Sequence, residues 1–478
     1  MKEEKLNISV IEAFPEDKKA LVDEALKEAF NDSKRKIVVL DDDPTGVQTV
    51  HDIYVYTNWT KESIKKAFEA PEKLFFILTN SRGLTVSETT KLHEEIAGHV
   101  DMVSKELGME YMIISRSDST LRGHYPLEPE LLRRGFEERN AEKIDGEILC
   151  PYFREGGRFT IGDVHYVKYG SELVPAADTE FAGDETFGYH SSDLKEYIEE
   201  KTKGEYPKES VASVSLSELR SLDFDGIEKK LEELRDFQKI VVNAVDDYDV
   251  KVFAVALYRA MSKGKHYIAR CAAALVKAVG NVSSRELLSR PEMVTEKNGH
   301  GGIIVVGSHT KKTTLQLEEL KKINDIHFIE MDSDLVLTPG ALEKETERIL
   351  REEEYYIEKG ITVCVSTKRT LLKVENDTPE EALKRSVRIS DAVQRCVGGL
   401  NVKPSFVVAK GGITSSDVGT KALKAVCALV LGQIEPGVPV WRVGEESRFP
   451  ETPYIIFPGN VGEVTTLLDA VKKLMGKN

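Results

Sequence analysis

The chain has 478 residues, which is too long for one ordinary hydrophobic core and predicts two domains. Hydrophobic residues make up 41% of it and charged residues 31%, which is typical of a globular protein and excludes global disorder. Its 66 basic and 81 acidic side chains give a net charge of -15, which opposes broad attraction to nucleic acids or anionic membranes. We therefore expect no nucleic acid and no membrane as partners.

The cysteines and the N-terminal residues predict a cytoplasmic protein. Five cysteines lie far apart and form no C-x-x-C pair, so the sequence encodes neither a zinc knuckle nor a redox pair. A sparse, odd number of cysteines suits a reducing compartment. The N-terminus has no apolar signal segment, and no later run approaches the roughly 18 apolar residues of a membrane span.

The first half of the chain alternates helices with buried strands. A charged amphipathic helix is expected from about Pro15 to Asn31, and a β-branched run predicts a strand at Lys36 to Leu40. Strands that end in polar turns are also expected at Leu74 to Leu78 and Tyr111 to Ile114. Beyond them, one helical apolar stripe is formed by Leu127, Leu131, Leu132 and Phe136.

The second half repeats this alternation after a polar segment. A strand at Ile303 to Val306 precedes a helix through Leu317 and Leu320, and a capping box at Thr378 predicts a helix to about Val397. Further strands are expected at Phe406 to Ala409 and Tyr454 to Phe457, the latter before a C-terminal helix. Between these strands, a helical stripe is predicted at Val418, Ala422, Leu423, Val426, Cys427 and Val430.

The predicted fold class is α/β with two domains, each a largely parallel sheet covered by helices. We expect domains at 1–280 and 302–478, joined by a linker at 281–301 for which a surface loop is the alternative. Ligands of open α/β sheets bind outside the carboxyl ends of the strands. We therefore expect the active site in the cleft between the domains, where the turns after the strands would meet.

The turns of the first half are rich in carboxylates and arginines. Arginine binds carboxylate or phosphate through two charge-assisted hydrogen bonds, and an aspartate can accept hydrogen bonds from sugar hydroxyls or act as a general base. Alternatively, the aspartates cap the following segment and the arginines form surface ion pairs. The candidate residues are Asp41, Asp42, Asp43, Arg82, Arg116, Asp118 and Arg122.

The turns of the second half are rich in glycine and small hydroxyls. A glycine turn between a strand and a helix lets backbone N–H groups face an anion, although such turns are also ordinary connections. Three of them occur, at Gly307–Ser308, at Gly411–Thr414 and at Gly459–Asn460.

Several common catalytic motifs are missing. No G-x-x-x-x-G-K-[ST] motif supports a P-loop nucleotide hydrolase, and no G-x-G-x-x-G opens a strand-to-helix unit. His93 and His99 do not form an H-E-x-x-H motif, and we expect both at the surface.

An ordered series of short motifs resembles the four-carbon acid sugar kinase family over residues 36–465. Asp42–Gly46 resembles its D-D-x-T-G element, Thr79–Arg82 its T-x-S-R element, and Asp118–Gly123 its D-S-T-L-R-G element. Cys150 to Arg158 is similar to its proline- and G-R-containing segment. The second half adds Gly307–Ser308, Gly411–Thr414, Glu435–Pro439 and Gly459–Asn460, with Ile413 where the family frequently has an acidic residue.

The resemblance implies an N-terminal sugar-acid domain, a C-terminal nucleotide domain, and ATP-dependent phosphorylation of the terminal hydroxyl of a tetronate or 3-oxo-tetronate. Asp42 or Asp43 would be catalytic, and magnesium is expected with ATP. The metal ligands are not assigned, and a homodimer is one option for the assembly. The implied substrate contacts are Asp42, Arg82, Arg116, Ser117, Asp118, Ser119 and Arg122, and the implied ATP contacts are Ser308, Gly411, Gly412, Ile413, Thr414 and Gly459.

Two other functions are compatible with these residues. One is a kinase of a different small polyhydroxy acid, since specificity depends on few pocket contacts. The other is a regulatory protein that binds sugar acid and nucleotide without turnover.

Overall fold

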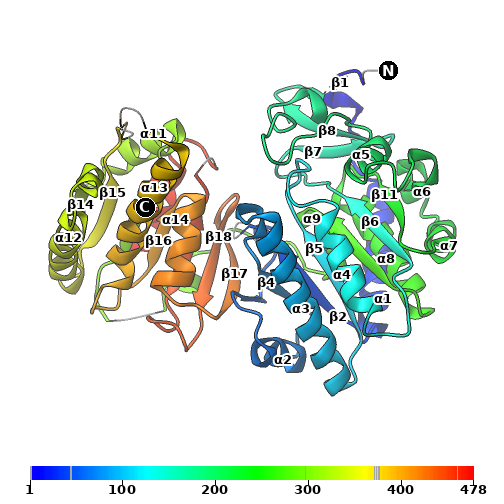
Figure 1. The fold of residues 1–478 in the computed structure, drawn as a ribbon, viewed down its shortest axis with the longest axis horizontal. Helices are drawn as coiled ribbons and strands as arrows, with labels where there is room; N and C mark the ends of the chain where they lie inside the picture. The colour runs from blue at the N-terminus through cyan, green and yellow to red at the C-terminus, as the bar shows by residue number, and fades with distance from the viewer. Residues whose placement is uncertain are drawn as a thin grey trace. The chain divides into compact units, whose positions relative to one another are not determined.

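The computed structural model describes residues 3–43, 46–295, 298–370, 372, 374, 377–459 and 461–477. The chain forms two compact units (Figure 1). Unit 1 comprises Met1–Thr49 and Asn58–Ser283, and unit 2 comprises Val50–Thr57 and Ser284–Asn478. Among the helices of the described residues, none is both long and apolar enough to cross a membrane.

Unit 1 is built on a parallel sheet whose strands are almost entirely buried. In spatial order the strands are β10 (Ala212–Val214), β11 (Gln238–Val242), β6 (Gly146–Cys150), β12 (Tyr267–Cys271), β5 (Tyr111–Arg116), β2 (Lys36–Asp41) and β4 (Leu74–Leu78). Their runs of Val, Ile and Leu are hydrophobic on both faces, as helix-covered parallel strands require.

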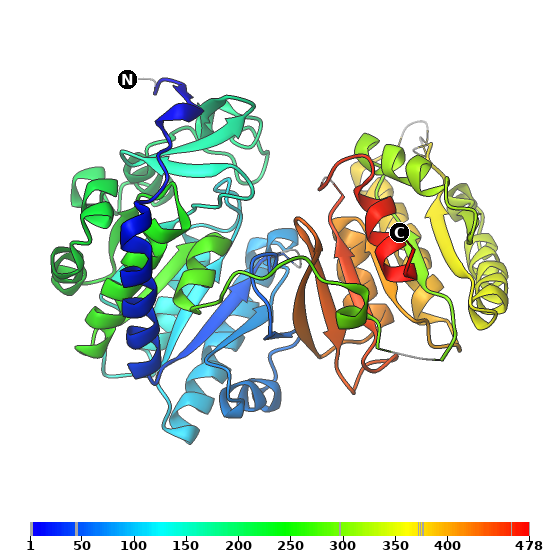
Figure 2. The same cartoon turned by 180° about the vertical axis from the view of Figure 1, so that it is seen from behind.

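Helices cover both faces of this sheet. Helices α3 and α4 lie on one face (Figure 1), and α1 lies with α8 on the other (Figure 2). The helices of unit 1 are α1 (Glu16–Asp32), α2 (Lys61–Glu69), α3 (Val86–Leu107), α4 (Leu127–Glu137), α5 (Leu194–Lys201), α6 (Leu216–Ser221), α7 (Phe224–Glu233), α8 (Asp247–Ser262) and α9 (Ala273–Val279).

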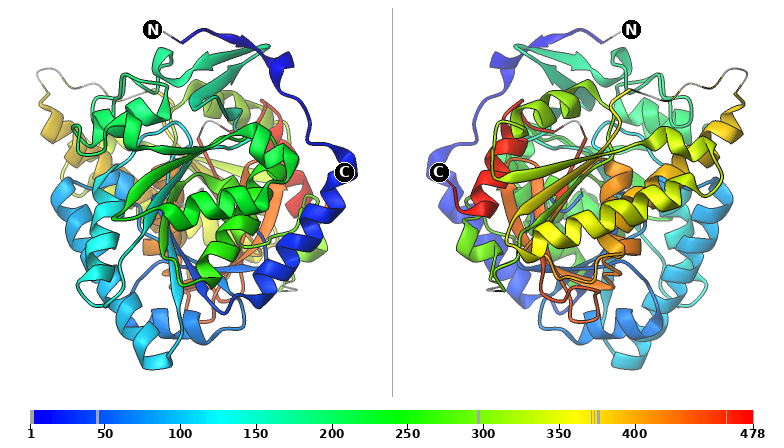
Figure 3. Two further views of the ribbon diagram at one scale, coloured as in Figure 1. Left: turned by 90° about the vertical axis from the view of Figure 1, so that its right-hand side faces the viewer. Right: turned by 90° about the vertical axis from the view of Figure 1, so that its left-hand side faces the viewer.

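A small antiparallel sheet accompanies the main sheet of unit 1. Its order is β1 (Leu6–Asn7), β9 (Glu172–Pro175), β8 (Val164–Tyr169) and β7 (Arg158–Ile161). The N-terminal segment runs along this sheet before it enters α1 (Figure 3). Thr160 joins the small sheet to the loop after β11 through mutual backbone hydrogen bonds with Ala244.

Unit 2 has a mixed sheet. Its order is β3 (Ile53–Tyr56), β17 (Cys427–Glu435), β18 (Val438–Val443), β19 (Pro453–Phe457), β16 (Val407–Lys410), β13 (Ile303–Val306), β15 (Thr362–Thr367) and β14 (Ile326–Met331). The pairs from β3 to β19 are antiparallel, whereas those from β19 to β14 are parallel.

Helices and strands of unit 2 share one hydrophobic core. Leu317 of α11, Leu467 and Val471 of α15, and Ile304 of β13 belong to one buried cluster. The helices of unit 2 are α10 (Arg290–Met293), α11 (Lys311–Leu320), α12 (Ala341–Glu358), α13 (Pro379–Gly398), α14 (Gly412–Asp417), a π-helix (Val418–Ala422) and α15 (Thr466–Met475).

The α/β class and the helix-covered, largely parallel sheets are confirmed. One predicted element is wrong: the helical stripe through Val426, Cys427 and Val430 does not exist, because the helix ends at Ala422 and β17 begins at Cys427. Apolar residues between 426 and 434 satisfy both a helical and an alternating spacing. The strand is favoured because β17 bonds to β3 on one side and β18 on the other.

The units divide at Ser283, inside the segment expected to link two domains. Part of that segment forms α10, and its Met293 is fully buried in the core of unit 2. Unit 2 also takes β3 from the first half of the chain, an element for which the sequence shows no separate domain signal.

Candidate functional site

The carboxylates and arginines of the first half gather at one edge of the unit 1 sheet. Strands β5, β2 and β4 are adjacent and parallel, so their carboxyl ends lie side by side. The last residues of β2 and β5 and the turns that follow β5, β2 and β4 carry the acidic–arginine cluster, which we define as Asp41, Asp42, Asp43, Arg82, Arg116, Asp118 and Arg122. Pro44 and Thr45 of the first turn lie outside the described residues.

Arg82 binds both aspartates that were predicted to be catalytic. Its Nη2 and Nε donate to the two carboxylate oxygens of Asp42 at 2.6 and 3.2 Å, and its Nη1 donates to Asp43 at 3.1 Å. Asp42 is 4% exposed. Its burial raises its pKa, although the charge of Arg82 acts in the opposite direction. A raised pKa brings a carboxylate closer to the neutral range in which a general base works best.

Asp41 faces Arg116 across the β2–β5 register, and Arg116 Nη1 donates to its Oδ1 at 3.0 Å. Burial outweighs this ion pair and raises the pKa of Asp41 to about 7. Its Oδ2 is buried without a hydrogen-bond partner in the described part of the chain. A Cβ at Gly46 would lie 1.9 Å from that oxygen, so only glycine fits there.

Asp118 forms the third part of the cluster. Arg122 Nε donates to it at 2.7 Å, and the Thr120 hydroxyl donates to the same oxygen. Burial opposes ionisation, but the charges of Arg82 and Arg122 lower the pKa of Asp118 to about 2. Ser117 and Ser119 are buried, and their backbones bond to Cys271 and His165. The structure thus brings all the predicted unit 1 site residues together.

A buried polar layer lies beneath this cluster. Arg270 of β12 forms a hydrogen-bonded ion pair with Glu128 and donates to Ser115 Oγ at 2.8 Å. Glu128 also accepts from Ser81 Oγ at 2.5 Å. His93 lies 3.7 Å from Glu128 and is 1% exposed, so its predicted surface location is wrong. Burial disfavours the charged, protonated imidazole of His93 and lowers its pKa.

The glycine turns of unit 2 also meet at one edge, at the carboxyl ends of β13, β16 and β19. A Cβ at Gly411 would lie 3.1 Å from Ser308 Cβ, and one at Gly459 would lie 3.0 Å from Ser308 Oγ. Gly411 has φ of 127°, which other residues rarely adopt. Asn460, part of the third predicted turn, lies outside the described residues.

Lys410 connects these turns from beneath. Its carbonyl oxygen accepts from the N–H groups of Gly307 and Ser308, each at 3.3 Å, and its Nζ donates to Pro458 O at 2.6 Å. The side chain is fully buried, and desolvation lowers its pKa to about 7, with a smaller effect from Lys312.

A cavity of about 280 Å³ opens beside the glycine turns, lined by Gly307, Ile413 and Thr414 and by Ile389 and Val393 of α13. Ile413 is 71% exposed. The apolar side chains and the nearby small residues suit a flat ring joined to an anionic group.

Arg369 lies next to Ser308. Its Nη2 donates to Ser308 O at 2.6 Å and to Thr314 Oγ1 at 3.0 Å. Its Nε and Nη1 are buried without a hydrogen-bond partner among the residues that the structure describes. This guanidinium therefore has donors left over for an anion.

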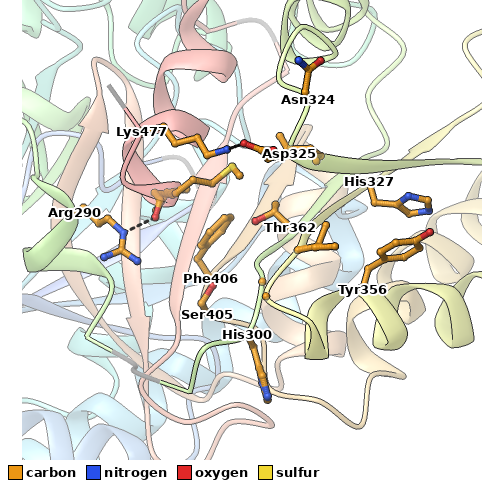
Figure 4. Close-up of a pocket in the computed structure, with 16 residues that line it drawn as sticks. Arg290, His300, Asn324, Asp325, His327, Tyr356, Thr362, Ser405, Phe406 and Lys477 are labelled. Carbon is orange, nitrogen blue, oxygen red and sulfur yellow. Dashed lines mark hydrogen bonds and ion pairs between the residues drawn. The ribbon is translucent and has the colours of Figure 1, made fainter.

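A larger cavity, of about 460 Å³, lies at the opposite ends of the same strands (Figure 4). Most of its lining residues begin or precede β13 to β16, the others come from α10, α12, α15 and Lys477, and none of the predicted nucleotide contacts lines it. His327 stacks on Tyr356 there, with ring centroids 3.7 Å apart, and Lys477 pairs with Asp325 (Figure 4). This cavity is not the glycine-turn site.

Sequence reasoning missed Glu128, Arg270, Arg369 and Lys410. Arg270 and Lys410 carry a signal that could have been used, since each is a charge near the end of an otherwise apolar strand. A buried strand tolerates such a charge only with partners.

Two family models match the chain, one in its N-terminal part and one in its C-terminal part. A family model described as a sugar-binding N-terminal domain matches residues 37–279, and one described as a nucleotide-binding C-terminal domain matches residues 303–467. A search of curated proteins found no match.

Two solved structures resemble the chain over nearly its whole length. A Haemophilus influenzae protein has 17% identity and a TM-score of 0.62, covering 91% of this chain and 100% of that chain. A Salmonella typhimurium LT2 protein described as a tRNA synthase has 14% identity and a TM-score of 0.67, covering 92% and 99%. Identities this low show a shared fold, whereas the two domain matches show the family: the chain belongs to the four-carbon acid sugar kinases.

Proposed function

We propose that the protein is an ATP-dependent kinase that phosphorylates the terminal C4 hydroxyl of a four-carbon sugar acid, such as a threonate, an erythronate or a 3-oxo-tetronate. One observation carries this proposal: a sugar-binding domain that contains a buried acidic–arginine cluster is joined to a nucleotide-binding domain with clustered glycine turns. Phosphoryl transfer depends mainly on positioning and charge neutralisation, which both sets of residues can provide.

The sugar acid would bind at the acidic–arginine cluster. Asp42 and Asp118 would accept hydrogen bonds from its hydroxyls, while Arg82 holds Asp42 in place. Arg116, Ser117, Ser119 and Arg122 complete the proposed contacts. Asp42, with Asp43 as the alternative, would orient the C4 hydroxyl and accept its proton at a carboxylate oxygen. Its buried position and raised pKa support that role.

The nucleotide would bind at the glycine turns, through Ser308, Gly411, Gly412, Ile413, Thr414 and Gly459. The fit is supported by the close approach of Gly459 to Ser308, where a Cβ would make a tight contact, and by the donors of Arg369 that lack a partner among the described residues. Bound ATP supplies the phosphoryl group, and magnesium neutralises the charge of its phosphates.

Asp377 is our candidate for holding the magnesium ion. It lines the cavity beside the glycine turns; its Oδ2 pairs with Arg385, and its Oδ1 is buried without a hydrogen-bond partner among the described residues. Magnesium at such sites uses one or two carboxylates together with the phosphates. A cytoplasmic location and a homodimeric assembly remain predictions.

The proposal is tested by measuring ADP release with the threonates, the erythronates and 3-oxo-tetronates, each with and without magnesium. We expect magnesium-dependent ADP release with at least one acid and a product that carries a phosphoryl group at C4. If sugar acid and ATP both bind but no acid releases ADP, the protein is a regulatory binder. If only a different polyhydroxy acid is phosphorylated, the proposed substrate class is wrong.

A further inference from the structure

Most arginines at the unit 1 site already have a carboxylate partner. Arg82 pairs with Asp42 and Asp43, Arg116 with Asp41, and Arg122 with Asp118. A substrate carboxylate that binds any of these arginines must compete with an aspartate that is already in place. An arginine without such a partner would bind the substrate carboxylate at lower cost.

Arg158, the first residue of β7, is such an arginine. In the described part of the chain, no carboxylate lies within ion-pair distance of it, and its Nε is buried without a hydrogen-bond partner. Its Nη1 donates to the carbonyl oxygen of Gly156, so the guanidinium is held by the turn before β7. The carboxylates of Asp118 and Glu180 act on it from a greater distance.

Arg158 lies beside the acidic–arginine cluster. Its guanidinium carbon is 5.5 Å from the ring centroid of Phe181, and that of Arg122 is 5.1 Å from the same centroid. Arg122 in turn binds Asp118 at 2.7 Å. Both guanidiniums thus lie near one ring, and the charges of Asp118 and Arg122 both act on Arg158. Arg158, which has no carboxylate partner among the described residues, is therefore in the neighbourhood of the groups that would bind the sugar hydroxyls.

We propose, building on the kinase function above, that Arg158 binds the C1 carboxylate of the sugar acid and makes the site select acids over neutral polyols. The guanidinium offers donors in one plane, which matches the two oxygens of a carboxylate. The aspartate-paired arginines then do not bind this carboxylate. They hold Asp41, Asp42 and Asp118 in place, and Arg116 and Arg122 contact the hydroxyl oxygens of the substrate. Partial burial without an anionic partner among the described residues is unfavourable for Arg158 and lowers its pKa, a cost that a bound carboxylate would offset.

The test measures the binding of a sugar acid, its neutral four-carbon polyol and ATP by titration calorimetry. We expect Arg158→Met to weaken acid binding roughly 100-fold, as loss of a charge-assisted bidentate contact would, and to leave polyol and ATP binding unchanged. Arg158→Lys keeps the charge and should retain part of the preference for acids. The matched control is Arg154→Met in the same turn, because Arg154 already pairs with Asp246 and its side chain is 57% exposed.

The outcomes separate this inference from the proposed function. If the wild-type protein binds no sugar acid, the kinase proposal itself fails. If it binds the acid and Arg158→Met binds acid equally well, or loses acid and polyol binding to the same extent, Arg158 does not recognise the carboxylate. Thermal unfolding of Arg158→Lys and Arg154→Met shows whether changes at this turn disturb the fold.

Discussion

Arg82 donates hydrogen bonds to both carboxylate oxygens of Asp42, at 2.6 and 3.2 Å, and to Asp43 from its remaining terminal nitrogen. Two aspartates from the turn after β2 are therefore fixed by one arginine from the turn after β4. Such a bidentate pair sets the orientation of a carboxylate as well as its charge. The two aspartates differ, since Asp42 is more deeply buried and accepts two hydrogen bonds from Arg82, whereas Asp43 accepts one.

We predict that Asp42→Asn lowers kcat by about 100-fold or more, as expected when a general base is removed. Asparagine keeps the shape of the side chain but cannot accept the proton of the C4 hydroxyl. ATP binding should be unchanged, because the nucleotide contacts are in the other domain. Asp43→Asn is the comparison and should lose less activity. Wild-type turnover by Asp42→Asn would exclude this residue as the base.

Asp41 should make stability depend on pH. The pKa of Asp41 is about 7 in the folded protein, against 3.8 ordinarily. At pH values between these two, the folded protein therefore keeps a proton on Asp41 that the unfolded chain has lost. This contribution to stability is present at low pH and is lost as the pH rises through about 7.

The wild-type unfolding temperature should therefore fall more between about pH 5 and about pH 8 than that of Asp41→Asn. The control is Asp118→Asn. Asp118 stays ionised throughout this range because its pKa is lowered to about 2. Equal pH dependence in Asp41→Asn and the wild type would contradict the assignment.

The parallel strands of both units follow from local sequence, and so does the gathering of their turns. Leu74–Leu78 and Ile303–Val306 form strands as predicted, because short β-branched and aromatic runs bounded by polar turns strongly favour a buried strand. Once β5, β2 and β4 are adjacent and parallel, Arg116, Asp41 and Arg82 must lie close together.

The antiparallel part of unit 2 could not be predicted in this way. Strand β3 pairs with β17, which lies more than 300 residues further along the chain. The spacing of apolar residues within a strand does not indicate which distant strand it pairs with. Partners of buried charges are equally non-local. Arg270 binds Glu128 from another element, and Asp41, which lies outside the D-D-x-T-G element, is the partner of Arg116.

Gly411 and Gly412 should respond differently to alanine. Gly411 has φ of 127°, and a Cβ there would approach Ser308 to 3.1 Å, whereas a Cβ at Gly412 would meet nothing within 4 Å. We predict that Gly411→Ala lowers the stability of the nucleotide-binding domain by about 1–3 kcal/mol, the usual cost of an unfavourable backbone conformation. Gly412→Ala should unfold at nearly the wild-type denaturant concentration. Equal stability of the two variants would show that the Gly411 turn is not strained by a side chain.

Lys410 should impose the opposite pH dependence on the nucleotide-binding domain. Its pKa is about 7 in the folded protein against 10.5 ordinarily, so the unfolded chain binds more protons between these values. Stability should therefore rise with pH from about 7 to about 10 in the wild type, and this rise should be absent in Lys410→Met. Denaturant titrations at several pH values measure it.

The same substitution tests how Lys410 joins the glycine turns. Loss of its hydrogen bond to Pro458 O frees the turn that contains Gly459, so Lys410→Met should bind ATP more weakly than the wild type at every pH. Lys312→Met is the control, because it removes the one charge that acts on Lys410 from α11 without touching Pro458. It should move the rise in stability to higher pH, since a repulsive neighbour is gone. A Lys410→Met protein with wild-type ATP affinity and an unchanged pH profile would show that the glycine turns keep their arrangement without this lysine.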